Sequence, residues 1–314
     1  MSAAKALAAA IAIALLRVPP ACAEPPPSPG ALRPRAPATL RTLERHWSRG
    51  ALWSLLPTSE APPHLSLREG ENYQVRAIEA AGSGVLVVWL PHAAGTETGS
   101  ELVARLATRR GWGVVSLLPP AELPPPGASA GDWVSLVEER VREGRAALHA
   151  RAAGARPCIA LMGVSVGGIA ALRVAELERE VDVVAAMLAG AGARGFLHAA
   201  RTYGASPDAP SPRTLERVAV LDPAEHAAQL AGRKVLLVRA RLDEAIPRDS
   251  FEALRSALGA PEVHGYPIGH ESFGYAMPFA IERALGWVER ACAERSREAA
   301  RLSRVIGCPR CPSR

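Results

Sequence analysis

Lysine, aromatic residues and long apolar runs are scarce in this 314-residue sequence. Lysine occurs only at Lys5 and Lys234, so nearly all of the 37 basic residues are arginine, and the formal net charge is +6. A positive charge can indicate a nucleic-acid partner, but these arginines form no run of five and are not interleaved with aromatic side chains. This distribution is typical of a solvated surface, and we expect no nucleic-acid partner.

The apolar run at residues 6–16 is eleven residues long, whereas a membrane-spanning helix takes about 20. Ala21-Cys22-Ala23 follows it with the small residues of a signal-peptidase site. We therefore predict a signal peptide over residues 1–23, a periplasmic or secreted protein, and no stable membrane insertion after cleavage. A lipid anchor on Cys22 is the alternative, although Pro19 stands where such a site usually has a Leu-like residue.

Four cysteines remain after that cleavage, and in an oxidising compartment they can pair. Cys158 opens an apolar run, which predicts that it is buried, and Cys292 lies far along the chain. Cys308-Pro-Arg-Cys311 begins six residues from the chain end, where thioredoxin-type enzymes do not place their motif. We predict a small terminal disulfide or no function for this last pair, and no metal site.

Composition divides the chain into four parts. Hydrophobic residues make up 48% of the sequence, which is enough for a sizeable core. After the signal peptide, residues 24–60 combine a Pro-rich tail with a short amphipathic stretch. Residues 61–297 have the periodicity of one folded domain, and residues 298–314 form a C-terminal tail that holds the two last cysteines.

Within the domain, strand and helix patterns alternate. Polar–apolar alternation predicts a β-hairpin at its start, and continuous apolar runs predict strands that are covered on both faces. The expected strands are residues 64–68, 73–78, 85–90, 113–118, 159–162, 181–188, 234–240 and 263–266. The expected helices are residues 101–110, 132–151, 168–178, 250–258 and 278–297. This order predicts an α/β fold with a mostly parallel sheet, helices on both faces, and chemistry at the carboxyl ends of the strands.

Residues 190–223 follow the sixth strand and are rich in Gly, Pro, Ala and Arg, so we predict a small irregular insert there. This insert is too short for a large lid. Phe196, Leu197 and Tyr203 within it, and the Pro-rich loop 119–126, are expected to form apolar walls of the site.

The segment Gly163-Val164-Ser165-Val166-Gly167 lies between an apolar strand and an Ala-rich helix. A turn this tight puts the central serine in a strained conformation and leaves no room for side chains two positions away, which Gly163 and Gly167 satisfy. The helix N-terminus then directs N–H groups at an anion that forms on attack. We interpret Ser165 as a nucleophile; a glycine-rich turn that serves only close packing is the alternative.

With this motif, the chain resembles the α/β-hydrolase superfamily over about residues 65–290, most nearly its carboxylesterase and dienelactone-hydrolase-like members. The family's chain order is nucleophile, acid, histidine. Asp243 follows the strand at 234–240, and His270 follows the strand at 263–266, in a Gly-His loop. The resemblance implies that His270 takes the serine proton and that Asp243 orients the imidazole. Glu244 is the nearest rival acid.

The resemblance also implies an oxyanion hole built from two backbone N–H groups. One is that of Val166, and the other comes from the loop after the strand at 85–90. Ala93 stands where many family members have glycine, so the second donor is Ala93 or Ala94. His92 in the same loop is interpreted as a residue that organises the loop rather than as a second base.

A serine, a histidine and an acid in these roles imply acyl transfer to water through an acyl-serine intermediate. We expect a small or medium carboxylic ester as substrate, and no metal or organic cofactor. An amidase, peptidase or thioesterase on the same fold is the first alternative. A non-catalytic binding member of the fold is the second.

Overall fold

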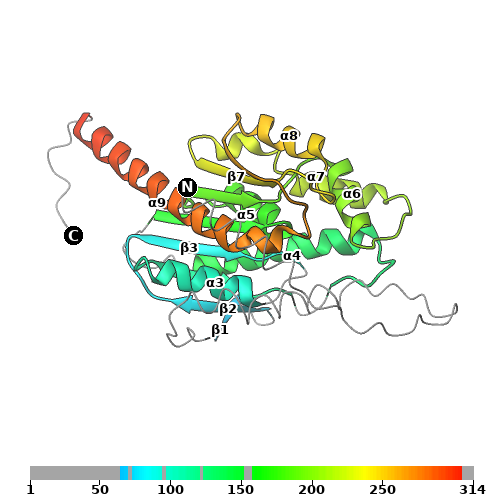
Figure 1. The fold of residues 1–314 in the computed structure, drawn as a ribbon, viewed down its shortest axis with the longest axis horizontal. Helices are drawn as coiled ribbons and strands as arrows, with labels where there is room; N and C mark the ends of the chain where they lie inside the picture. The colour runs from blue at the N-terminus through cyan, green and yellow to red at the C-terminus, as the bar shows by residue number, and fades with distance from the viewer. Residues whose placement is uncertain (1–63, 70–72, 94–96, 121–122, 152–157, 306–314) are drawn as a thin grey trace, which may run out of the picture. The chain divides into compact units, whose positions relative to one another are not determined.

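The computed structural model describes residues 64–69, 73–93, 97–120, 123–151 and 158–305 (Figure 1). All of them belong to one compact unit of the chain, Leu40–Arg314. The expected signal peptide and N-terminal tail, and both cysteines of the C-terminal motif, lie outside the described residues. Within those described ranges, no helix is long and apolar enough to cross a membrane.

Eight strands form one sheet in the order β1-β2-β4-β3-β5-β6-β7-β8. Antiparallel pairing joins β1 to β2 and β2 to β4, and all other neighbours are parallel. The strands are β1 (His64–Glu69), β2 (Tyr73–Ala80), β3 (Val85–Leu90), β4 (Gly113–Leu117), β5 (Cys158–Val164), β6 (Val183–Met187), β7 (Lys234–Ala240) and β8 (Glu262–Tyr266). The predicted hairpin and the predicted mostly parallel sheet are both confirmed.

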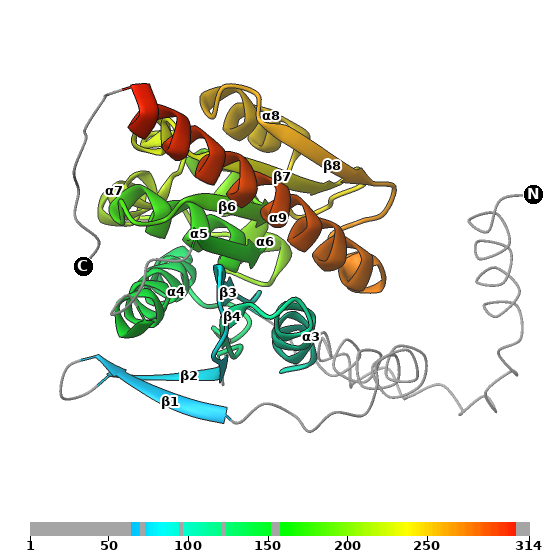
Figure 2. The same ribbon diagram turned by 90° about the vertical axis from the view of Figure 1, so that its left-hand side faces the viewer.

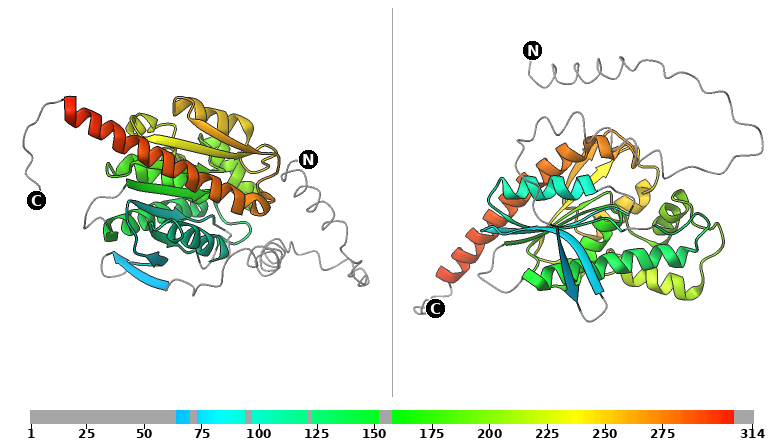
Figure 3. Two further views of the ribbon diagram at one scale, coloured as in Figure 1. Left: turned by 60° about the vertical axis from the view of Figure 1, so that its left-hand side comes forward. Right: turned by 90° about the horizontal axis from the view of Figure 1, so that it is seen from below.

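Helices cover both faces of this sheet, as expected. They are α3 (Glu97–Thr108), α4 (Ala130–Arg151), α5 (Val166–Leu177), α6 (Ala193–Thr202), α7 (Pro212–Leu221), the short 3₁₀ helix η3 (Ala227–Leu230), α8 (Arg248–Ala257) and α9 (Phe273–Val305). Figures 2 and 3 place α3 and α9 on one side of the sheet and α4 on the other. The two faces therefore carry separate apolar cores.

The residues of strand β3 contribute alternately to the apolar cores on the two faces of the sheet. All six of its residues are buried, and successive side chains point to opposite faces. Leu86, Val88 and Leu90 pack with the residues of α4 and α5. Val87 and Trp89 pack with the residues of α3 and α9. A strand covered on both faces has no solvent side, which explains its uninterrupted apolar run.

The insert after β6 is more ordered than expected, because residues 190–223 contain α6 and α7 rather than irregular chain. The hydroxyl of Ser211 accepts a hydrogen bond from Thr214 N at 3.1 Å, and Pro212 is the first helical residue of α7. A serine cap followed by proline is a helix-start signal. The prediction of an irregular insert was wrong because it followed the Gly and Pro content of the segment, although Phe196, Ala199 and Ala200 stand at helical spacing and pack against the core.

Helix α9 begins before its expected start at Pro278 and continues past its expected end at Arg297. Proline suits the first turn of a helix, and Pro278 is the first residue of the expected range 278–297. The turn that precedes it is held by Phe273, which is 1% exposed and packs in the core beneath α9. Tertiary packing therefore places the helix start earlier than local propensity predicts.

A disulfide joins Cys158, the first residue of β5, to Cys292 in α9. The two cysteines are 134 positions apart in the sequence, and their Cα atoms are 5.8 Å apart. Cys292 is buried, whereas Cys158 is only partly buried, contrary to the expectation for it. The bridge ties the strand that leads to Ser165 to the C-terminal helix.

Candidate active site

Ser165 occupies the sharp turn between β5 and α5. Its backbone angles are φ 56° and ψ −120°, a conformation that residues other than glycine rarely adopt. The turn is held from both sides, since Ser165 N donates to Met187 O at 2.8 Å and Gly168 N donates to Ser165 O at 2.9 Å. Strain of this kind persists only where the surroundings fix it, and it is concentrated at functional sites.

Close backbone packing around this turn explains its glycines. A Cβ atom on Gly163 would lie 2.1 Å from Gly167 O, and one on Gly167 would lie 2.1 Å from Leu90 O. Gly168, which the sequence reasoning did not single out, is equally constrained, because its Cβ would lie 2.6 Å from Met187 O. The turn can pass between β3 and β6 only with glycine at these positions.

The structure brings Ser165, Asp243 and His270 together from three different loops. His270 Nε2 lies 3.0 Å from Ser165 Oγ, and His270 Nδ1 lies 2.9 Å and 3.0 Å from the two oxygens of Asp243. The side chains of His270 and Asp243 are 6% and 8% exposed. An ionised carboxylate can only accept hydrogen bonds, so Nδ1 carries the hydrogen and Nε2 is free to accept the hydrogen of the serine hydroxyl.

Asp243 and Glu244 are adjacent in sequence but bind different parts of the histidine loop. Asp243 contacts the imidazole, and its Oδ1 also accepts from Ala245 N at 3.0 Å and Ile246 N at 2.7 Å. Glu244 instead accepts from the backbone, from His270 N at 2.8 Å and Glu271 N at 2.9 Å. Of the two rival acids, the one that reaches the imidazole is Asp243.

The charge of Glu244 is stabilised in this position. Partial burial opposes ionisation, but the backbone N–H groups of Glu271 and His270 outweigh it and hold the pKa of Glu244 below its usual value. Gly269 accommodates this contact, because a Cβ atom there would lie 2.5 Å from Glu244 Oε2. The carboxylate therefore fixes the loop that carries His270.

Ser165 opens into a cavity of about 80 Å³. Val166 and Ala93, the two expected oxyanion donors, both line it, while Ala94 lies outside the described residues. Val166 is the first residue of α5, so its N–H has no acceptor within the helix. The remaining lining residues are His92, Leu123, Trp133, Val164, Leu188, Tyr203, His270, Glu271, Phe273, Gly274 and Met277.

Two titratable neighbours of the triad are held neutral. Burial, together with the nearby His270, lowers the pKa of His92 to about 4. Burial, with the surrounding carboxylates, raises the pKa of Tyr203 well above its usual value. The ring of Tyr203 meets that of His270 edge-on, with centroids 5.9 Å apart. His92 is therefore an uncharged residue that lines the cavity.

The cavity walls were anticipated in part. Tyr203 and Leu123 of the Pro-rich loop line this cavity as expected, whereas Leu197 does not. Trp133 and Met277 were not anticipated. Trp133 follows the loop after β4, and that position was the available signal, because loops at the carboxyl ends of parallel strands converge on one edge. Met277 comes from α9, and nothing local in its sequence marks it.

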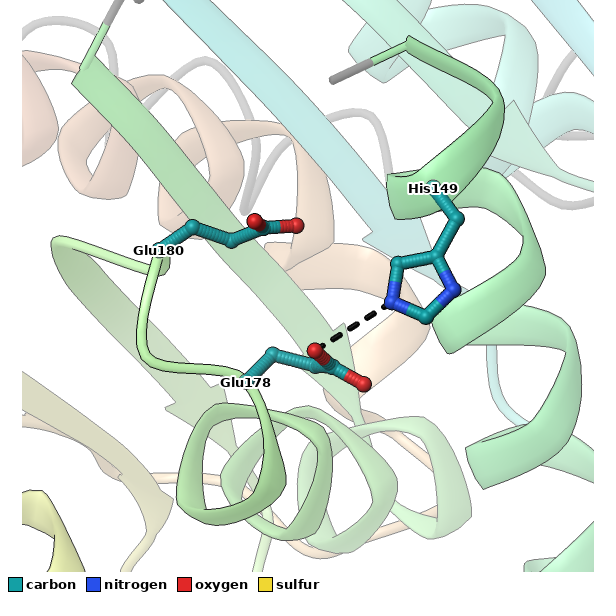
Figure 4. Close-up of side chains that lie close together, drawn as sticks. All are labelled: His149, Glu178 and Glu180. Atoms are coloured by element: carbon teal, nitrogen blue, oxygen red, sulfur yellow. Dashed lines mark ion pairs between the residues drawn. The ribbon is translucent and has the colours of Figure 1, made fainter.

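A different group of side chains, His149, Glu178 and Glu180, has donor atoms within 4.8 Å of one another (Figure 4). His149 Nε2 lies 3.2 Å from Glu178 Oε2, and Arg145 Nε lies 2.6 Å from the other oxygen. Burial works against the charge, but these two partners hold the pKa of Glu178 below its usual value. The guanidinium already neutralises the carboxylate, so we interpret the group as an ion-pair network rather than a metal site.

Comparison of the sequence with models of known protein families gives no match, and comparison with curated proteins gives none either. Solved structures do match. An esterase of Pyrococcus furiosus superposes with a TM-score of 0.54 at 12% identity, covering 73% of this chain and 91% of that chain. The esterase domain of a Rhodothermus marinus protein gives a TM-score of 0.54 at 16% identity, covering 73% and 98%.

The acylaminoacyl peptidase of Pyrococcus horikoshii gives a TM-score of 0.57 at 14% identity, covering 77% of this chain and 43% of that one. At these identities the likeness concerns the arrangement of the backbone. It agrees with the mostly parallel eight-stranded sheet that helices cover on both faces (Figure 2). The chain has the α/β-hydrolase fold.

Proposed function

We propose that the protein is an exported serine hydrolase that cleaves a small or medium carboxylic ester through an acyl-serine intermediate. The observation that carries this proposal is the hydrogen-bonded series from Asp243 through His270 to Ser165, with the serine strained at a turn that opens into a cavity. The fold supports the reaction class only by analogy, because one fold hosts many functions.

In the first half of the reaction, Ser165 Oγ attacks the ester carbonyl carbon while its proton passes to His270 Nε2. The carbonyl oxygen becomes an anion, and the proposed donors that stabilise it are the N–H of Val166 and the N–H of Ala93 or Ala94. Asp243 holds the imidazole in its tautomer and stabilises the imidazolium. The intermediate then collapses, the bond to the alkoxy oxygen breaks, and that oxygen leaves as an alcohol with the proton from His270.

In the second half, water attacks the acyl carbon and gives its proton to His270 Nε2. The bond between the acyl carbon and Ser165 Oγ breaks, and Oγ recovers the proton from the histidine. The net change is one ester and one water converted to one carboxylic acid and one alcohol. No cofactor takes part in either half.

Export is part of the proposal. The disulfide between Cys158 and Cys292 supports it, since structural disulfides are maintained in oxidising compartments. Mass spectrometry of the protein recovered from a secreting host tests this proposal. We expect a mature chain that begins at Glu24, whereas a lipid-modified Cys22 at the N-terminus would establish the anchored alternative.

A fluorophosphonate probe tests the reaction class. We expect it to label the purified protein and to leave the Ser165→Ala variant unlabelled. Equal labelling of both proteins, or of neither, would contradict the assignment of Ser165. Matched ester, amide and thioester panels then test the substrate class, and we expect kcat/KM to be highest for the esters; a preference for amides would replace the esterase proposal with an amidase.

A further inference from the structure

A second cavity, of about 60 Å³, meets the first one at Ser165. Residues of α4, α5, α6 and α7 form its walls. Ser165, Val166, Trp133 and Tyr203 line both cavities, and the rings of Trp133 and Tyr203 pack with centroids 6.1 Å apart. The serine therefore stands where two cavities join, beside a pair of aromatic rings.

The two cavities differ in which reacting groups they contain. His270 and Ala93 line the first cavity and are not among the residues that line the second. In the proposed mechanism the departing alcohol must receive its proton from His270 Nε2, so the alcohol has to lie in the cavity that contains this atom. The acyl group stays bonded to Ser165 Oγ and receives no proton from His270, so it does not have to lie in the first cavity.

We infer that the second cavity is the acyl pocket and that the enzyme selects short aliphatic acyl groups. This inference rests on the proposed ester hydrolysis and adds the class of acid that the substrate carries. It also assigns the first cavity to the alcohol. The acyl chain would run from Ser165 between α5 and α6 towards Phe196 and Leu221.

The chemistry of the pocket favours an apolar chain. Two polar side chains, Asp222 and Ser250, line the second cavity and not the first. Asp222 accepts from Gly192 N at 2.7 Å and from Ala224 N at 3.0 Å. Ser250 Oγ donates to Ala191 O at 2.7 Å and accepts from the N–H of the same residue at 3.0 Å. Both groups already have backbone partners, so they do not call for a polar substrate.

The size of the pocket favours a short chain. A cavity needs roughly 10–15 Å³ for one water-sized group. The space of about 60 Å³ therefore holds about four to six non-hydrogen atoms. Butanoyl and hexanoyl groups match this size, whereas a decanoyl group does not.

The test uses two series of esters on the full-length mature protein. The acyl series is p-nitrophenyl acetate, butanoate, hexanoate and decanoate; the alcohol series is methyl, p-nitrophenyl and naphthyl butanoate. Ala199→Leu fills the second cavity from α6, where Ala199 is only partly buried and a longer side chain has room. We expect this variant to lower kcat/KM for hexanoate relative to acetate by about tenfold or more, and to keep the wild-type ranking of the alcohols.

Two further variants keep the inference falsifiable if that one folds poorly. Phe196→Ala enlarges the second cavity and should move the acyl preference towards longer chains. Met277→Ala enlarges the first cavity alone and should change the alcohol ranking but not the acyl ranking. If changes at Ala199 and Phe196 alter the alcohol ranking, or alter neither ranking, the assignment of the acyl pocket is overturned.

Alkylphosphonate p-nitrophenyl esters separate this inference from the proposed function. They modify a nucleophilic serine and hold their alkyl group where an acyl group would lie, without needing ester turnover. We expect the wild type to react faster with a butylphosphonate than with a decylphosphonate, and Ala199→Leu to narrow that difference. If Ser165 reacts but both proteins show the same chain-length dependence, only the acyl pocket fails; if Ser165 of the wild type does not react, the proposed function fails and this inference with it.

Discussion

Helix α5 has a histidine–carboxylate pair near each end, and the two pairs differ in their surroundings. At the N-terminal end, His270 and Asp243 are 6% and 8% exposed, and the free ring nitrogen meets the hydroxyl of Ser165. At the C-terminal end, His149 and Glu178 are 44% and 13% exposed, and Arg145 shares the carboxylate. Residue types alone do not distinguish these pairs.

Burial and the third partner give each pair its chemistry. At the N-terminal end of α5, the imidazole of His270 contacts the hydroxyl of Ser165 and lines the cavity. It can therefore transfer a proton to or from the atoms of a substrate bound there. At Glu178, the third partner is a guanidinium that is permanently charged, so the group contributes only an ion pair near solvent. The comparison predicts which substitutions affect activity and which affect only stability.

The largest expected effect follows from removing the charge of Asp243. In Asp243→Asn, the amide can still accept from Ala245 N, but its NH₂ group faces His270 Nδ1 and favours the wrong tautomer. We expect kcat for a butanoate ester to fall by about 10⁴-fold. The matched variant Glu178→Gln should change kcat by less than about twofold and stability by at most about 1 kcal/mol. Similar losses of activity in Asp243→Asn and Glu178→Gln would contradict the conclusion that only the His270–Asp243 pair takes part in catalysis.

The next largest effect is expected at the turn between β5 and α5 that carries Ser165. Gly167→Ala places a Cβ atom 2.1 Å from Leu90 O and 2.5 Å from Pro91 O, so the backbone must move. We expect Gly167→Ala to lower the free energy of unfolding by about 3 kcal/mol or more and to lower kcat. Denaturant unfolding measures the first change, and ester hydrolysis assays measure the second. Gly286→Ala in α9 is the control, since its Cβ would meet only Arg290 Nη1 at 4.0 Å. It should leave stability unchanged or raise it by up to about 1 kcal/mol.

A smaller effect is expected at Glu244. Its carboxylate binds backbone N–H groups, whereas that of Glu178 binds the side chains of Arg145 and His149. Glu244→Ala frees the loop that carries His270, and a small displacement of the base should lower kcat by about 10- to 100-fold with little change in KM. Glu244→Gln keeps one good acceptor oxygen and should recover part of the loss. Equal changes in kcat and KM, with no recovery in Gln, would indicate a structural role only.

The smallest expected effect is a pH dependence of stability that arises from Glu176, near the C-terminal end of α5. Burial raises the pKa of Glu176 from 4.5 to about 7, although its hydrogen bond to Arg173 opposes this. The folded state therefore binds the proton more tightly than the unfolded state, and the resulting stability is present below pH 4.5 and is lost as the pH rises to about 7. We expect the Tm of the wild type to fall by a few degrees across this window.

The Glu176→Gln variant should show a flatter Tm profile over the same window, because it cannot ionise. Thermal unfolding of both proteins at matched ionic strength measures the difference. Parallel profiles would mean that Glu176 contributes nothing to the pH dependence. Because Glu176 lines neither of the two cavities, the variant should keep wild-type kcat.

The sequence predicted most of this architecture where the signal was local. The apolar run of β3 and the glycines around Ser165 reflect constraints that neighbouring residues impose directly, and both agree with the structure. The insert was misjudged, because its Gly and Pro residues indicate irregular chain, whereas Phe196 and Ala199 of α6 pack against the core at helical spacing. The contribution of Met277 to the cavity was missed because it depends on contacts between elements far apart in the sequence, whereas the position of Trp133 after the loop that follows β4 was a signal that could have revealed it.

By itself, the sequence determined the order of strands and helices and the serine turn, since these depend on side-chain periodicity and on backbone sterics. Only the tertiary structure decided which of two adjacent acids reaches His270 and that Cys158 pairs with Cys292. It also decided that two cavities meet at Ser165. These contacts join residues up to 134 positions apart. They depend on how elements far apart in the sequence pack together in the fold, and no local pattern encodes that packing.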